Sequence, residues 1–165
     1  MNLKDELTSL YNSLLEKNEV EGLAFLAERF AGEIVFSTSF GLEDQVITHL
    51  ILDNHIPISI FTLDTGRLFS ETYSVWESTG ERYNTHITPY YPNTQAIEKY
   101  VNDNGPLSFY KSVDLRKECC HIRKVEPLSR ALAGKKVWVT GLRAEQSNAR
   151  KDLPILEWDD AYQLY

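Results

Sequence analysis

The chain has 165 residues, of which 42% are hydrophobic, and this is enough for one domain with a sizeable buried core. Its net charge of −7 argues against binding to nucleic acid or to a membrane surface, and no apolar run is long enough to span a bilayer. Because the N-terminus lacks a secretory signal and two cysteines cannot build a disulfide framework, we expect a cytoplasmic protein.

Apolar periodicity predicts two N-terminal helices, at residues 3–17 and 20–30, with Gly32 as the C-cap of the second. Short apolar runs then indicate buried parallel strands, which we expect at residues 34–36, 58–63, 86–88 and 136–140. A further short strand is expected at residues 154–158.

Helical patterns separate these strands. We expect one helix after residue 44, one starting near Phe69 and one at 94–102. Residues 107–115 look irregular. A helix from Glu118 then carries both cysteines until Pro127 breaks it and begins another.

This alternation of strands and helices predicts an α/β protein with a mostly parallel sheet. We expect residues 1–165 to form a single domain, with helices over 1–32 and the sheet over 33–160.

Three polar loops follow strands directly, at residues 37–44, 64–67 and 141–150. Ligands bind at the carboxyl ends of parallel strands, so these loops are candidate binding segments. In the first loop we expect free backbone N–H groups at Ser37, Thr38 and Ser39 to suit an oxyanion, with Glu43 and Asp44 capping the following helix.

The other two loops leave alternatives open. Asp64 either holds its loop by hydrogen bonds or meets a ligand. Arg143 and Arg150 flank Gln146 and offer planar forks suited to phosphate or sulfate, although a surface arginine is the commoner case.

Cys119 and Cys120 are adjacent, and neighbouring cysteines make a strained and ineffective crosslink. They are buried thiols, a redox-sensing pair, or two thiolate ligands of a metal or iron–sulfur cluster. A zinc site lacks a partner C-x-x-C in this chain. Residues 111–151 hold eleven Lys/Arg against four Asp/Glu, a balance of +7, which favours a small anionic ligand in this region.

Four segments carry a more specific pattern: STSFGLEDQVITHLI, FTLDTGRLFSETY, KECCHIRKVEPL and VTGLRAEQSNAR. In order and spacing they resemble the adenylyl-sulfate and phosphoadenylyl-sulfate reductases of assimilatory sulfate reduction, over roughly residues 34–160. The resemblance implies a doubly wound, adenine-nucleotide α-hydrolase-like fold of the PP-loop type.

The resemblance also implies a sulfonucleotide site for adenylyl sulfate and its product AMP. The first loop becomes a modified pyrophosphate loop, the second holds the adenosine, and basic side chains contact the phosphosulfate. The implied residues are Ser37, Thr38, Ser39, Phe40 and Gly41; Leu63, Asp64, Thr65 and Gly66; and Lys124, Arg143, Gln146 and Arg150.

In this family, tandem cysteines mark the branch with a 4Fe–4S cluster and a preference for adenylyl sulfate, which implies that Cys119 and Cys120 are two of four cluster ligands. The implied reaction is thiolate attack on the sulfate sulfur, which forms a cysteine S-sulfonate and releases AMP. Thioredoxin or glutaredoxin then releases sulfite. A homo-oligomer is compatible with this reading.

The family has a later C-x-x-C and a Glu-Cys-Gly-Leu/Ile-His segment with the nucleophile, and this chain ends at Tyr165 before both. We therefore expect a fragment or a truncated protein with two of the four cluster ligands and no catalytic cysteine. The alternatives are a reductase of the 3′-phosphorylated nucleotide, a relative of the small subunit of ATP-dependent sulfate adenylyltransferase, which the tandem cysteines argue against, or a non-catalytic nucleotide-binding module.

Overall fold

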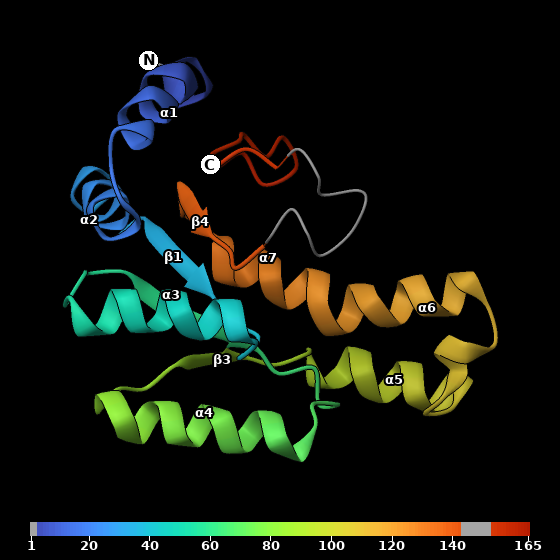
Figure 1. The fold of residues 1–165 in the computed structure, drawn as a ribbon. Coiled ribbons are helices and arrows are strands. Elements are labelled where there is room, and N and C mark those ends of the chain that lie inside the picture. The colour runs from blue at the N-terminus through green and yellow to red at the C-terminus, as the bar shows by residue number, and fades with distance from the viewer. Residues whose placement is uncertain (1–2, 143–152) are drawn as a thin grey trace. The chain divides into compact units, whose positions relative to one another are not determined.

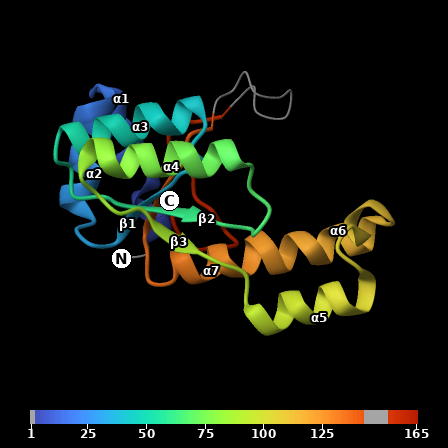
Figure 2. The same cartoon turned by 90° about the horizontal axis from the view of Figure 1, so that it is seen from below.

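The computed structural model describes residues 3–142 and 153–165, and the chain divides into two compact units. The first unit consists of Met1–Ile60 with Gly134–Tyr165, and the second of Phe61–Ala133. Each unit contains parallel strands and helices, which are labelled across Figures 1 and 2.

The first unit is built around the parallel pair of β1 and β4, in which Ile34 lies opposite Val137 and Phe36 opposite Val139. The N-cap of the helix α2 is Asn18, whose side chain forms a reciprocal capping box with Glu21. Its elements are η1 (Leu3–Glu6), α1 (Leu7–Leu15), α2 (Glu19–Arg29), β1 (Ile34–Ser37), α3 (Leu42–Asp53) and β4 (Val137–Val139).

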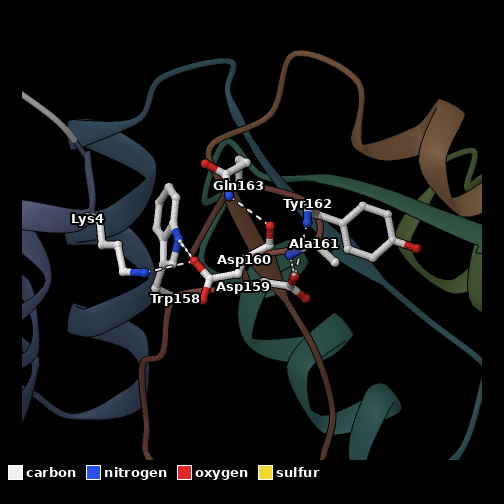
Figure 3. A network of polar contacts seen from close by, with 7 residues as sticks. All are labelled: Lys4, Trp158, Asp159, Asp160, Ala161, Tyr162 and Gln163. Carbon is white, nitrogen blue, oxygen red and sulfur yellow. Dashed lines mark hydrogen bonds and ion pairs between the residues drawn. The ribbon is translucent and has the colours of Figure 1, made fainter.

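The last described residues of this unit lie against the edge of β4. The backbone N–H of Trp138 donates to the carbonyl of Tyr165 at 2.8 Å, and the N–H of Tyr165 donates to the carbonyl of Lys136 at 2.9 Å. Lys4 forms a hydrogen-bonded ion pair of 2.8 Å with Asp160 (Figure 3). The hydrogen bond from Lys4 is the main reason why the pKa of the Asp160 carboxyl group is lowered. The N-terminal helices and the C-terminal segment are thereby joined within the unit.

The second unit contains the parallel pair of β2 and β3, with Phe61 opposite Thr88 and Leu63 opposite Tyr90. The helix α7 packs on β3, and α5 lies alongside the run from α6 to α7 in both views (Figures 1 and 2). Its elements are β2 (Ser59–Leu63, of which residues 61–63 fall in this unit), α4 (Ser70–Tyr83), β3 (Thr88–Tyr90), α5 (Thr94–Asn104), η2 (Ser108–Tyr110), α6 (Val113–Cys120), the π-helix η3 (His121–Val125) and α7 (Glu126–Leu132).

Several predicted boundaries were wrong. The third strand includes Pro89, which is opposite Thr62, instead of ending before it. The strand expected at 154–158 is absent from the described residues there, where only an isolated bridge joins Asp159 to Leu164. The helix α2 ends at Arg29 with Phe30 as its C-cap, not Gly32.

The helix that carries the cysteines also differs from expectation. It begins at Val113, because the Ser112 side chain accepts a hydrogen bond of 3.1 Å from the N–H of Leu115 and caps it. Pro127 does not break the helical backbone, since the caps of α7 at Val125 and of η3 at Glu126 both have right-handed helical angles. Pro127 lies in the first turn of α7, directly after the π-helix η3.

The predicted class, a parallel α/β fold with N-terminal helices, is confirmed. The expectation of one domain over 1–165 stays a prediction. None of the helices in the described ranges is long and apolar enough to cross a membrane.

Candidate functional site

The loop between β1 and α3 satisfies many of its polar groups internally. The hydroxyl of Ser37 accepts a hydrogen bond of 2.8 Å from the Trp138 indole, and the hydroxyl of Thr38 accepts one of 3.0 Å from the N–H of Phe40. Phe40 itself has a positive φ of 62°, so the chain turns sharply just before Gly41, the N-cap residue of α3. These two hydrogen bonds and the turn at Phe40 therefore help to define the shape of the loop.

Asp44 completes this loop and does not cap α3. One of its carboxylate oxygens accepts hydrogen bonds of 2.6 Å from both the N–H and the hydroxyl of Ser39. The N-cap residue Gly41 makes no side-chain capping bond. The expectation of a free N–H at Ser39 was wrong, because the Asp44 carboxylate folds back onto it.

Position 141, just after β4, needs a glycine because Asp44 leaves no room there for a side chain. A Cβ atom at residue 141 would lie 2.0 Å from a carboxylate oxygen of Asp44, far inside van der Waals contact. The first and third loops, which both belong to the first unit, thus meet at Gly141 and Asp44.

In the second loop, Asp64 holds the chain by hydrogen bonds. The buried Asp64 accepts a hydrogen bond of 2.8 Å from the N–H of Gly66. The hydroxyl of Tyr73 donates to the same carboxylate and lies 3.0 and 2.9 Å from its two oxygens. Hydrogen bonding to this carboxylate is the main cause that raises the pKa of Tyr73, and burial adds to it. The structure shows these loop-holding contacts, and a contact of Asp64 with a ligand stays a prediction.

Cys119 and Cys120 line a cavity of about 250 Å³ in the second unit. Cys119 is buried and Cys120 is exposed, so the two thiols differ in access. The lining residues are Thr65, Arg67, Phe109, Cys119, Cys120, Arg123 and Lys124. Three cations and two thiols around one cavity suit an anionic occupant.

Within this cavity the second loop and the cysteine helix lie together. Thr65 belongs to the predicted adenosine loop, and its carbonyl accepts a hydrogen bond from Arg123. Lys124 is exposed and has no acidic partner within the described residues. It is therefore available to a ligand in the cavity.

Three of the predicted site residues, Arg143, Gln146 and Arg150, lie outside the described residues. Ser37, Thr38, Ser39, Phe40 and Gly41 form the loop of the first unit, whereas Leu63, Asp64, Thr65, Gly66 and Lys124 belong to the second.

From the sequence, Arg67 lies in the second candidate binding loop without a role of its own, and Phe109 and Arg123 have no predicted role. Arg67 stacks on the Phe109 ring at 4.7 Å and donates a bond of 2.6 Å to the carbonyl of Pro106. A signal was present, because Arg67 directly follows Asp64-Thr65-Gly66 and Arg123 directly precedes Lys124.

As candidate metal ligands, Cys119 and Cys120 fit half of an iron–sulfur site. They line one cavity, and nearby cations would offset the charge of a thiolate-bound cluster. No group of three or more potential ligands from His, Cys, Asp or Glu occurs within the described ranges.

Fold and site together define a parallel α/β protein with polar loops after its strands and a cationic cavity beside two thiols. Comparison with known families is more specific: residues 33–164 match the phosphoadenosine phosphosulfate reductase domain. The chain belongs to this family.

Two curated relatives and a solved structure support the same family assignment. The chain is 48% identical over 155 residues to a protein from Allochromatium vinosum named adenosine 5′-phosphosulfate reductase, covering 93% of this chain and 60% of the relative. It is 48% identical over 139 residues to a protein of the same name from Burkholderia cepacia, covering 84% of this chain and 55% of the relative. The crystal structure of a phosphoadenylyl-sulfate reductase from Candida auris, described as a phosphate complex, matches with a TM-score of 0.78 and 25% identity, covering 98% of this chain and 76% of that chain. The chain thus spans 60% or less of the length of these two curated relatives.

Proposed function

We propose that this chain is the sulfonucleotide-binding part of an adenylyl-sulfate reductase, which converts adenylyl sulfate to sulfite and AMP in sulfate assimilation. The observation that carries the proposal is the shared cavity, in which Thr65 of the predicted adenosine loop lies with Lys124 and the two cysteines. The names of the relatives support adenylyl sulfate as the substrate.

In the proposed reaction, a cysteine thiolate attacks the sulfur of adenylyl sulfate, a sulfur–sulfur bond forms and AMP leaves with the electron pair of the broken bond. A dithiol reductant, thioredoxin or glutaredoxin, then releases sulfite and becomes a disulfide. The family resemblance assigns the attacking cysteine to a segment beyond the matched motifs. Lys124 would stabilise negative charge on the reacting nucleotide.

We also propose that Cys119 and Cys120 supply two ligands of a 4Fe–4S cluster, and that the protein works in the cytoplasm. When bound, such a cluster adds charge and polarisation next to the nucleotide. Arg67 and Arg123 line the same cavity and would lie near it.

Calorimetric titration with adenylyl sulfate, AMP and the 3′-phosphorylated analogue tests the proposal. We expect adenylyl sulfate and AMP to bind, and the 3′-phosphorylated nucleotide to bind more weakly. Tighter binding of the 3′-phosphorylated form would favour the alternative substrate, and no nucleotide binding at all would refute the proposal.

Lys124→Ala is expected to weaken adenylyl-sulfate binding by about 1–3 kcal/mol, because one charge-assisted interaction is lost. Lys117→Ala is a matched control, since Lys117 is exposed on α6 and does not line the cavity. We expect a loss of the same size for Arg150→Ala. Unchanged affinity in both the Lys124 and Arg150 variants would show that these side chains do not contribute to adenylyl-sulfate binding.

A further inference from the structure

Arg123 joins the helix that carries the cysteines to the loop after β2. Its guanidinium donates a hydrogen bond to the carbonyl of Thr65. The same nitrogen lies beside Gly66, where an added Cβ atom would be 3.4 Å away, an ordinary van der Waals distance. One side chain therefore contacts two successive residues of the predicted adenosine loop.

Two further features mark this side chain. Its Nε atom is buried and has no hydrogen-bond partner in the part of the chain that the structure describes. Buried polar groups normally have a partner, so this one calls for an explanation. It also lies in the π-helix that starts directly after Cys120. Short π-helices are rare and are often found at functional sites.

We propose that Arg123 is a positioning residue that couples the state of the cysteine pair to nucleotide binding at the loop of Leu63 and Thr65. A group attached to Cys120 shifts the adjoining helical turn, and Arg123 carries that shift to the Thr65 carbonyl. The inference rests on the proposed function, because it takes this loop as part of the nucleotide site.

The test measures AMP affinity by calorimetry before and after alkylation of the exposed Cys120 with iodoacetamide, with a single adduct verified by mass spectrometry. In the wild-type chain we expect alkylation to weaken AMP binding by about fivefold or more, the lower end of typical coupling between sites. In Arg123→Gln we expect less than about a twofold effect, because the link to Thr65 is lost. Arg123→Lys keeps a charge and a donor, so the effect of alkylation on its AMP affinity should be intermediate between those two.

Arg130→Gln is the matched control. Arg130 also donates to a backbone carbonyl, that of Tyr91, but it does not line the cavity. This variant should respond to alkylation as the wild type does, which separates coupling from the general loss of an arginine.

An equal effect of alkylation in wild type and Arg123→Gln would mean that the adduct obstructs AMP directly, and would overturn the inference. Absence of any effect in the wild type would overturn it as well. If AMP fails to bind the unmodified wild-type chain, the proposed function falls and this inference falls with it.

Discussion

Replacement of Asp64 by alanine is expected to lower the free energy of unfolding by about 3 kcal/mol, because hydrogen bonds to a buried charge are among the stronger ones. Asp64 is 4% exposed, and its carboxylate accepts hydrogen bonds from Gly66 and Tyr73. Without it the Gly66 turn, with its φ of 69°, loses its main restraint. Denaturant titration measures the loss, and AMP titration of the folded variant should show weaker binding.

Two milder variants test how much each hydrogen bond of Asp64 contributes to the free energy of unfolding. Asp64→Asn keeps a carbonyl acceptor and should lose less stability than Asp64→Ala. Tyr73→Phe removes only the hydroxyl and should cost about 1 kcal/mol. If Asp64→Ala proved as stable as wild type, the loop would not depend on this carboxylate.

The pair of Asp64 and Tyr73 also predicts a dependence on pH. The pKa of Tyr73 is raised above its ordinary value of 10.0, mainly by the hydrogen bond to Asp64, so the folded state favours the protonated phenol. Its contribution is fully present below about pH 10 and is lost as the pH rises through the higher folded-state pKa. The stability difference between wild type and Tyr73→Phe should stay constant from neutral pH to that point and shrink above it. A difference that already shrinks near pH 7 would contradict this assignment.

Alanine at position 141 is expected to lower the free energy of unfolding by about 2–3 kcal/mol, because the added methyl group overlaps the Asp44 carboxylate and forces it away from Ser39. Asp44 is 8% exposed, and a Cβ atom would also come within 3.2 Å of its backbone nitrogen, so the site has little room to adjust. Denaturant titration gives the cost directly.

A double-mutant cycle isolates this contact. In an Asp44→Ala background the additional cost of Gly141→Ala should fall by at least about 1 kcal/mol, because the overlapping carboxylate is gone. Gly22→Ala is the matched control, since a Cβ atom there meets only Leu14 at an ordinary 3.4 Å and Gly22 lies inside α2. That control should be neutral or slightly stabilising. Equal costs for Gly141→Ala in both backgrounds would show that Asp44 is not the obstacle.

Much of the fold was predictable because its signals are local. The strand β1, the loop before α3 and the helix that carries Cys119 and Cys120 all follow from apolar periodicity and polar residues at strand ends. The errors had different causes. Pro89 remains in β3 because of its pairing with β2, and the pattern at residues 154–158 was too short to distinguish a strand from an irregular segment.

By itself, the sequence determined the α/β class, the polar loops after the strands, the tandem cysteines and the family, because these depend on order and spacing along the chain. Only the tertiary structure decided what the charged side chains contact: Asp44 bonds to Ser39 instead of capping its helix, Asp64 to Tyr73, and Arg123 to Thr65 across 58 positions. The physical reason is that the direction of a side chain depends on the packing of the elements that carry it, and residue spacing does not specify that packing.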